Sequence, residues 1–424
     1  MTDTAQFNRR RFLMAASAAG LIAGPAGATT IVSQRGRDGI LEYPTDRPPV
    51  LDIHSMIDQP VIIREVQHLR HSKRSFFMRV LAENGAAGVI KCNGRMRDAA
   101  GLFYRRVRPG LIGTDARDIE QTFETLYRGR GKRGYKYAAL AYYTGVGHAE
   151  LAIWDLLGRV AGKRVADLIG TPSTERVPVY LSRLTRETTP EEETEIVTRT
   201  VAETGGRAIK LKIGGRMSLN QDAMPGRTDR MVAMMRDALG DDMVIYVDAN
   251  GSYDAPTAIE VGRMLEDNGV TLYEEPCPWE DFEMTKQVAD ALDVPVAGGE
   301  QDSSLPKWRW MIENRGVDIV QPDLIYNGGI LRTLKVARMA AAAGMKMTPH
   351  YPRNGGEAAP LIHFASALPN FSGYMEYRAH TPRFDFDYAP IIEVTDGTVP
   401  LPPGPGFGID FDPAIFDKAE VLGT

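Results

Sequence analysis

The sequence predicts an α/β protein built around a TIM-type (β/α)8 barrel. Eight short apolar runs recur from about residue 176 onward, and helical, amphipathic stretches separate them. Strands that alternate with helices form parallel sheets, and eight such units close a barrel. An antiparallel pattern precedes these runs and a Pro/Gly-rich tail follows them. We therefore expect an N-terminal α+β capping domain that the C-terminal tail completes.

These changes of pattern set the expected domain boundaries. Alternating apolar residues from Ile62 to Cys92, with a turn at Glu83-Asn84-Gly85, predict an antiparallel meander. Apolar residues spaced by three and four predict two helices next, over 115–128 and 137–161. The expected organisation is a signal peptide at 1–28, a capping domain at 60–170, a barrel at 176–390 and a C-terminal segment at 391–424 that packs on the capping domain.

The eight apolar runs define the expected barrel strands. Their residues are 177–183, 208–214, 243–250, 270–276, 294–300, 317–323, 345–350 and 371–377. Stretches such as 255–269 and 329–344 have the period of packed helices and lie between consecutive runs.

Composition excludes several classes of protein. The chain has 424 residues, 43% of them hydrophobic and 25% charged, as in soluble globular proteins. The formal net charge of −5 argues against a nucleic-acid partner. The basic run at 128–136 is isolated and is typical of a solvated helix end. Cys92 and Cys277 are the only cysteines and provide neither a disulfide framework nor a zinc motif.

The N-terminus has the three zones of an export signal. Arg9-Arg10-Arg11 is followed by an apolar stretch from Phe12 to about Ala23, and small residues end at Ala28. The arginines before Phe12 and Leu13 resemble a twin-arginine signal. The apolar stretch is too short for a membrane anchor. We expect a periplasmic protein that has no membrane association once residues 1–28 are removed.

Ionisable residues stand at the ends of seven consecutive predicted strands. They are Lys210, Lys212, Asp248, Glu274 or Glu275, Glu300, Asp323, His350 and Glu376. The C-terminal ends of barrel strands meet at one mouth, where active sites form. Because strand neighbours point to opposite faces, one of the two adjacent glutamates should enter the mouth and the other should turn toward the surrounding helices or loop. Alternation alone does not choose between them.

These residue types define a reaction class. Three neighbouring carboxylates would repel one another unless a cation held them, and oxygen-only ligands favour Mg²⁺, with Mn²⁺ as an alternative. Lys210 and Lys212 are two residues apart and so share the inner face of their strand. His350, with Asp323 to orient it, stands on the other side. A metal between two bases suits removal of the proton α to a metal-bound carboxylate, with the metal and a lysine stabilising the enediolate.

The whole pattern resembles the mandelate racemase branch of the enolase superfamily over about residues 60–410. The resemblance rests on the motifs KLK, VDAN, EEP, GGE, QPD and TPH, and on steps of 26, 26, 23 and 27 residues from Asp248 through Glu274, Glu300 and Asp323 to His350. The muconate-lactonizing branch has a lysine on the sixth strand, where this chain has Asp323. That difference argues against cycloisomerase or dipeptide epimerase chemistry.

The resemblance implies roles for individual residues. It implies Asp248, Glu274 and Glu300 as metal ligands, Lys212 as one base with Lys210 nearby, His350 paired with Asp323 as the other base, and Asn250 and Glu376 beside the substrate. Glu275 then takes an outer or structural position. The spacing from His350 to Glu376 differs from that of the family, and the insert after Lys212, residues 213–227, is longer, so its role is open. Arg353 and Arg378 follow strand ends and are candidates to hold a second carboxylate.

The expected function is that of a homo-oligomeric enzyme acting on a small-molecule carboxylate. We expect dehydration of an acid sugar or hydroxy diacid to a 2-keto acid, with racemisation or epimerisation of a 2-hydroxy acid as the alternative. The polar segment at 68–75 favours dehydration, and Phe76 and Phe77 point the other way. A periplasmic sugar-acid binding protein is a remote alternative, because it would have two similar lobes and no metal triad.

Overall fold

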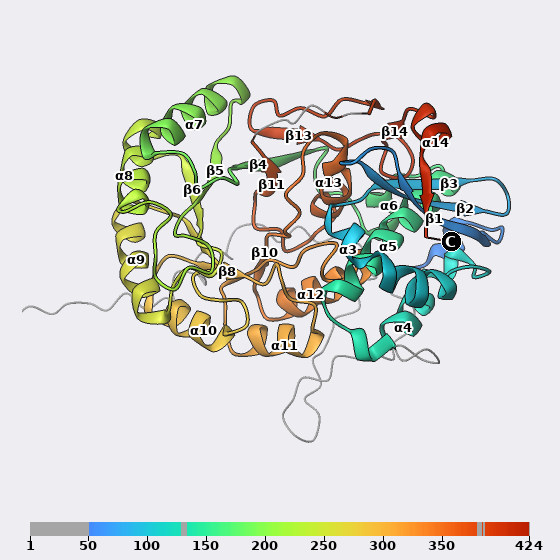
Figure 1. Ribbon diagram of the computed structural model, residues 1–424, viewed down its shortest axis with the longest axis horizontal. Helices are drawn as coiled ribbons and strands as arrows, with labels where there is room; N and C mark the ends of the chain where they lie inside the picture. Colours follow the sequence, from blue (N-terminus) through green and yellow to red (C-terminus); the bar gives the residue numbers. More distant parts are fainter. Residues whose placement is uncertain (1–50, 129–133, 380–383, 385, 424) are drawn as a thin grey trace, which may run out of the picture. The chain divides into compact units, whose positions relative to one another are not determined.

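The computed structural model describes residues 51–128, 134–379, 384 and 386–423 (Figure 1). The signal peptide predicted at 1–28 and the middle of the basic run at 128–136 lie outside the described residues. Within the described part of the chain, no helix is both long enough and apolar enough to cross a membrane.

The capping domain contains a four-stranded antiparallel sheet. Its strands, in spatial order, are β15 (Glu420–Leu422), β1 (Ile63–Arg70), β2 (Phe76–Ala82) and β3 (Ala87–Lys91). The register pairs Val66 with Val80 and Leu69 with both Phe77 and Val421. This confirms the predicted meander, and it confirms that the C-terminal tail completes the sheet.

Helices cover this sheet, and α5 (Leu140–Ala161) is the longest of them. Every residue of α5 from Tyr142 to Gly158 is buried, because the helix packs between the sheet and the rest of the protein. At Gly88 any Cβ would overlap the helix backbone at Ala152, so only glycine permits this approach of β3. The other helices before the barrel are α2 (Ile53–Met56), α3 (Arg95–Leu102), α4 (Ile119–Arg128) and α6 (Val165–Ile169).

The eight predicted barrel strands are all present and parallel. They are β4 (Arg176–Ser182), β5 (Ala208–Lys212), β6 (Val244–Asp248), β7 (Leu272–Glu274), β8 (Val296–Gly298), β9 (Ile319–Val320), β10 (Lys346–Met347) and β11 (Met375–Arg378). Each strand pairs with the next in chain order as far as β10, and β11 pairs with β4. A parallel bridge between Met347 and Phe371 joins β10 to the segment that leads into β11. The predicted (β/α)8 fold is therefore confirmed.

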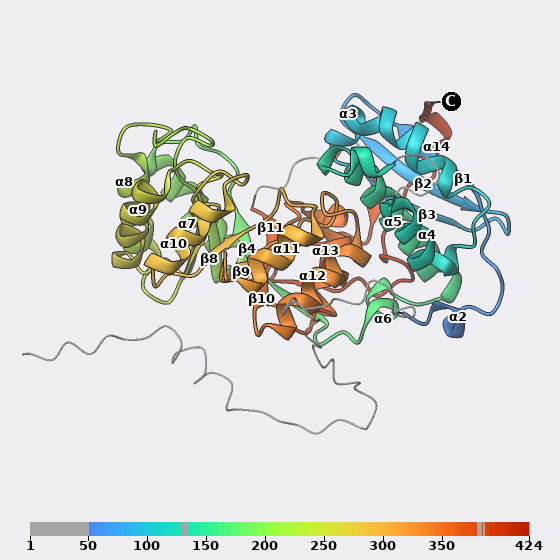
Figure 2. The same cartoon turned by 90° about the horizontal axis from the view of Figure 1, so that it is seen from below.

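Helices follow the strands and lie around them, as Figures 1 and 2 show. They are α7 (Pro190–Thr204), α8 (Arg227–Leu239), α9 (Ala255–Asp267), α10 (Phe282–Ala291), α11 (Leu305–Glu313), α12 (Ile330–Ala342) and α13 (Ala359–Ser366). Helix α7 begins with a capping box in which Thr189 and Glu192 satisfy each other's backbone N–H groups. The C-terminal segment adds β12 (Tyr388–Ala389), β13 (Thr398–Pro400), β14 (Asp410–Phe411) and α14 (Ala414–Lys418).

The strand register sorts the barrel interior into layers. Tyr180, Ala208, Tyr246, Leu272 and Ala297 form a buried cluster, in which the rings of Tyr180 and Tyr246 meet edge to face. Residues two positions further along a strand lie on the same face. The apolar layer is therefore followed, toward the C-terminal ends of the strands, by a layer of ionisable side chains.

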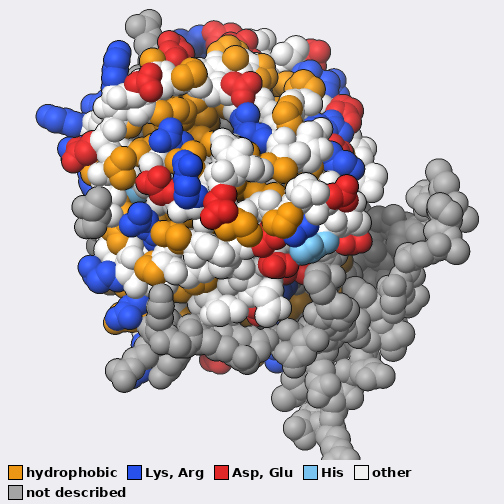
Figure 3. All heavy atoms as spheres, turned by 90° about the vertical axis from the view of Figure 1, so that its right-hand side faces the viewer, with side chains coloured by type: hydrophobic (Ala, Val, Ile, Leu, Met, Phe, Trp, Pro, Cys, Tyr) orange, Lys and Arg blue, Asp and Glu red, His pale blue; other side chains and the backbone are white. Residues whose placement is uncertain are grey.

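On the face shown in Figure 3, basic and acidic side chains of the described residues are interspersed, and neither sign forms a continuous surface.

Candidate active site

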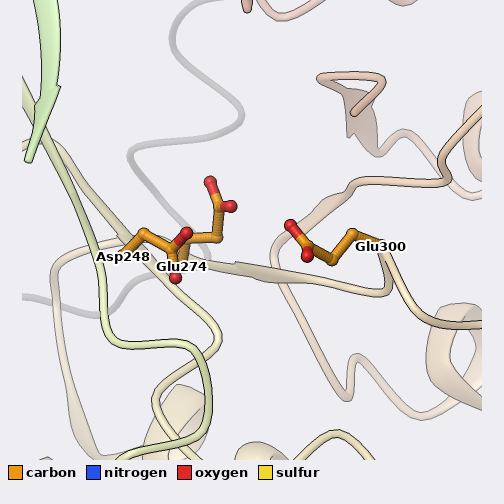
Figure 4. Close-up of side chains that lie close together, drawn as sticks. All are labelled: Asp248, Glu274 and Glu300. Carbon is orange, nitrogen blue, oxygen red and sulfur yellow. The ribbon is translucent and has the colours of Figure 1, made fainter. Parts of the chain in front are cut away.

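Three buried carboxylates converge at the ends of β6, β7 and β8. Asp248 and Glu274 are register partners at the last positions of their strands, and Glu300 follows β8 by two residues. One oxygen of each lies within 4.8 Å of the others (Figure 4). Carboxylates this close and this buried repel one another unless a cation compensates. The donor set contains only oxygen and therefore fits a hard divalent ion such as Mg²⁺.

Two lysines of β5 neutralise part of this charge. Lys210 is fully buried, and its Nζ lies 2.8 Å from both carboxylate oxygens of Glu274 and 3.1 Å from Glu376 Oε1. Lys212 forms an ion pair with Asp248 and is 5% exposed, so it lies nearer the opening than Lys210. Both lysines are on the inner face of the strand, where alternation predicted them.

Burial raises the pKa values of these carboxyl groups, and the two lysines lower them. Burial opposes the charge of Lys210, but Glu274 and Glu376 outweigh it and hold the pKa of Lys210 well above its usual value. Lys210 is therefore held as a cation. Burial raises the pKa of Glu274 to about 7 against the opposing effect of Lys210. For Asp248 the ammonium groups of Lys212 and Lys210 overcome burial, and the pKa falls below its ordinary range.

His350 lies between Asp323 and the carboxylate cluster. Its Nδ1 is 2.7 Å from Asp323 Oδ2, and its Nε2 is 2.9 Å from Glu300 Oε2 and 3.6 Å from Glu376 Oε2. Burial disfavours the imidazolium, but Glu300 and Glu376 outweigh it, so the pKa of His350 is well above its usual value. The structure thus brings together the His350–Asp323 pair and the predicted metal ligands.

Glu376 completes the ring. Its Oε1 accepts a hydrogen bond from Ser182 Oγ at 2.8 Å. Burial works to raise its pKa, but Lys210 and His350 prevail and lower it to about 2. Its altered spacing from His350 therefore does not remove Glu376 from the cluster.

The three predicted substrate-contacting residues differ in how far protein groups already occupy their side chains. Asn250 Nδ2 is 3.1 Å from Asp248 Oδ2 and 3.1 Å from Glu275 Oε2, and Asn250 Oδ1 accepts from Arg186 Nη2 at 3.0 Å. Its amide is thus occupied at both ends by protein groups. Arg353 Nη1 donates to the Pro352 carbonyl, and its Nε lies 3.6 Å from Glu357. Arg378 ends β11, two residues beyond Glu376. Contact of any of the three with a substrate stays a prediction.

Glu275 lies against the loop after β6, one of the two directions that the sequence left open for it. Its backbone has a φ of +42°, which ends the strand geometry directly after Glu274. Its buried side chain lies beside Asn250, within electrostatic reach of Glu300 and Asp248. Burial first, and then these carboxylates, raise the pKa of Glu275 well above its usual value.

The sequence interpretation missed two polar residues of the site. Gln321 Nε2 donates to Glu274 Oε2 at 2.9 Å. Gln321 lies two residues before Asp323, so strand alternation places both on the same face and could have identified it. Arg186 reaches Asn250 from the loop after β4. No local sequence pattern marks Arg186, because a loop residue has no periodicity to follow.

Two family descriptions match the chain. Residues 44–170 match the mandelate racemase / muconate lactonizing enzyme N-terminal domain, and residues 192–415 match the enolase C-terminal domain-like family. An arabinonate dehydratase of Saccharolobus solfataricus is 30% identical over 76% of this chain and 83% of that protein. A D-galactarolactone cycloisomerase of Agrobacterium fabrum is 29% identical over 82% of this chain and 92% of that protein.

Solved structures agree with the fold. A candidate racemase from Roseobacter denitrificans is 34% identical, with a TM-score of 0.79, over 85% of this chain and 98% of that one. A mandelate racemase/muconate lactonizing protein from Paracoccus denitrificans, solved with magnesium, is 27% identical, with a TM-score of 0.77, over 85% and 99% of the two chains. The chain belongs to the mandelate racemase/muconate lactonizing branch of the enolase superfamily.

Proposed function

We propose that this protein is an acid-sugar dehydratase, which removes the proton α to a carboxylate and expels the β-hydroxyl to give a 2-keto acid. One observation carries the proposal. Lys212 contacts Asp248 at one end of the carboxylate cluster, and His350 contacts Glu300 at the other end. A substrate carboxylate held at the cluster would therefore have a proton-transferring group on either side. The similarity to an arabinonate dehydratase supports the same class of reaction.

Asp248, Glu274 and Glu300 would hold the divalent ion. When bound, that ion would supply positive charge that acidifies the α-proton and stabilises the resulting enediolate. The magnesium in the Paracoccus denitrificans relative supports Mg²⁺ as the ion.

The chain's own groups would move the protons. Lys212 would take the proton from the α-carbon. His350 is held protonated by Glu300 and Glu376, so its Nε2 suits donation of a proton to the departing β-hydroxyl, which leaves as water. The enol that remains becomes the 2-keto acid by gaining a proton at the β-carbon and losing the proton of its hydroxyl group. A substrate of opposite configuration at the α-carbon would reverse the two roles. Lys210, held as a cation, would stabilise negative charge on the substrate.

Racemisation or epimerisation is the second candidate, because a base on each side of an α-carbon is also what proton exchange with inversion requires. The similarity to a candidate racemase supports this reading. Both reactions begin with loss of the α-proton, and only dehydration produces a keto acid.

The test is a screen of aldonic and aldaric acids with Mg²⁺ in D₂O. Dehydration predicts keto-acid formation for at least one acid, detected by semicarbazone absorbance. If the α-proton exchanges with inversion and no keto acid forms, the protein is a racemase or epimerase and not a dehydratase. No exchange and no keto acid across the panel would overturn both.

We also propose that the protein is exported to the periplasm by the twin-arginine route. Arg9, Arg10 and Arg11 directly before an apolar stretch support this. Arg10 belongs to both adjacent arginine pairs, so Arg10→Lys removes both. The full chain should appear in the periplasmic fraction, and the variant should stay in the cytoplasm. The proposal would be contradicted if the wild-type chain and the Arg10→Lys variant were distributed equally between periplasm and cytoplasm.

A further inference from the structure

Arg378 lies on the inner face of the barrel at the end of β11. Glu376 belongs to the ionisable cluster, and residues two apart in a strand share a face. The α-carbons of Glu376 and Arg378 are separated by about 7 Å along the strand. The backbone N–H of Arg378 donates to the Arg353 carbonyl at 3.0 Å, which fixes the start of the side chain beside the loop that follows His350.

The guanidinium of Arg378 has no direct partner among the described residues. No hydrogen bond or ion pair joins it to another side chain in this part of the chain, although the residue is only partly exposed. Burial and the neighbouring charge of Arg353 lower the pKa of Arg378, and Glu357 and Glu376 act on it only through longer-range attraction. A half-buried guanidinium on the inner face of the barrel, without a direct protein partner, is available to pair with an anionic ligand.

Arg353 differs from Arg378 because it already has a carboxylate partner. Glu357 lies 2.6 Å from Lys91 Nζ and 3.6 Å from Arg353 Nε. Lys91 and Arg353 therefore share the Glu357 carboxylate. The third cation, Arg378, is left for a ligand.

We propose that Arg378 binds the distal carboxylate of a dicarboxylic sugar acid, whose other carboxylate is held at Asp248, Glu274 and Glu300. This inference rests on the proposed function and narrows its substrates from sugar acids in general to diacids. A planar guanidinium pairs with a carboxylate through two parallel hydrogen bonds. The nearby charges of Glu357 and Glu376 disfavour a more highly charged group such as a phosphate.

The experiment compares acids that differ only at the distal carbon, such as galactarate and galactonate or glucarate and gluconate. The wild-type enzyme should prefer the diacid of a productive pair in kcat/KM. Arg378→Gln should reduce kcat/KM for the diacid by about 10- to 100-fold, the usual range for a lost charge-assisted pair. The same change should alter kcat/KM for the monoacid by less than about threefold, and Arg378→Lys should restore part of the diacid rate.

Arg199→Gln is the matched control, because Arg199 is an exposed residue of α7 away from the cluster. Equal effects of Arg378→Gln on diacid and monoacid, or no effect on either, would overturn this inference and leave the proposed function standing. Absence of turnover for every acid would overturn the proposed function itself.

A second measurement does not depend on the folding of a variant. Adipate should inhibit the wild-type enzyme at least about tenfold more strongly than hexanoate, and added salt should reduce the difference. Equal inhibition by the two acids would contradict a distal carboxylate site.

Discussion

His350 and Asp323 form a hydrogen-bonded pair across two neighbouring strand ends, with 2.7 Å between Nδ1 and Oδ2. The other carboxylate oxygen of Asp323 accepts the backbone N–H groups of Ile325 and Tyr326 at 2.7 and 2.8 Å. Asp323 is therefore fixed by its own loop before it meets the ring. The pair leaves Nε2 of His350 facing Glu300 and Glu376.

Replacement of Asp323 by Asn should disturb His350 and leave metal binding intact. The amide keeps the size of the side chain but cannot stabilise an imidazolium, and loss of such a general acid or base typically costs about 10²- to 10⁴-fold. We expect kcat to fall in that range while the Kd for Mg²⁺ changes little. Steady-state kinetics and calorimetric metal titration check this, with Asp290→Asn on the exposed face of α10 as control. A kcat within tenfold of the wild-type value would contradict the assignment.

Glu274→Gln should weaken metal binding directly. Loss of a residue that only orients a metal ligand costs about 10- to 100-fold in metal affinity, so loss of a ligand should cost at least about 100-fold. Titration with Mn²⁺, followed by its electron paramagnetic resonance signal, measures the change without reference to activity. Glu283→Gln, on the exposed side of α10, is the matched control. Unchanged affinity in Glu274→Gln would remove Glu274 from the ligand set.

Chelation should abolish activity without unfolding the protein. Lys210 pairs with Glu274, Lys212 with Asp248 and His350 with Glu300, so each of the three carboxylates keeps a counter-charge when no metal is bound. We expect the far-ultraviolet circular dichroism spectrum to survive EDTA, with a lower Tm that rises again as Mg²⁺ is added. Loss of secondary structure on chelation would show that these ion pairs do not suffice to keep the metal-free protein folded.

Much of this site could be predicted because parallel strands in register bring their ends together. Asp248 and Glu274 are register partners, and both stand where a short apolar run ends. Strand alternation likewise placed Lys210 and Lys212 on one face. Such arguments need only local sequence and a regular backbone.

The same arguments fail where the backbone leaves the strand geometry. Glu275 has a positive φ, so alternation no longer describes where its side chain goes. Asn250 also has a positive φ, of +43°, and its partners Glu275 and Arg186 come from segments distant in sequence. The contrast between Arg353 and Arg378 depends on Glu357 and Lys91, which are distant from each other in sequence. Which cation pairs with Glu357 depends on how distant segments pack together, and local sequence does not show this.

Glu275→Ala and Glu275→Gln should differ in their effect on the metal site. Glu275 and Asp248 both accept a hydrogen bond from Asn250 Nδ2, so Glu275 helps hold the amide that orients Asp248. The raised pKa of Glu275 favours its neutral form, which Gln imitates. We expect Glu275→Ala to weaken Mn²⁺ binding by about 10- to 100-fold and Glu275→Gln to change it by less than about threefold. Equal losses in the two variants would show that the charge of Glu275 matters and not its hydrogen bond.

Glu150 is a buried carboxyl group that joins α5 of the capping domain to the start of α12. Its Oε1 accepts from Leu331 N at 2.8 Å and from Trp154 Nε1 at 3.1 Å. Tyr127 Oη lies 2.9 Å from Glu150 Oε2 and 3.0 Å from the Gly328 carbonyl. One hydroxyl proton can serve only one of these acceptors. A protonated Glu150 resolves the conflict, because it donates to Tyr127 while Tyr127 donates to Gly328.

Glu150→Gln should therefore stabilise the protein at neutral and higher pH. Burial raises the pKa of Glu150 from 4.5 to about 7, so the folded state binds a proton that the unfolded state has lost. The stability that this proton provides is present in full below pH 4.5 and declines as the pH rises to about 7. Gln keeps the neutral arrangement at every pH, and its amide group can donate to Tyr127. We expect the variant to match the wild type near pH 4.5 and to be more stable by up to about 3 kcal/mol at pH 8, as measured by urea unfolding. A stability difference that does not change between these pH values would show that Glu150 is ionised in the folded protein.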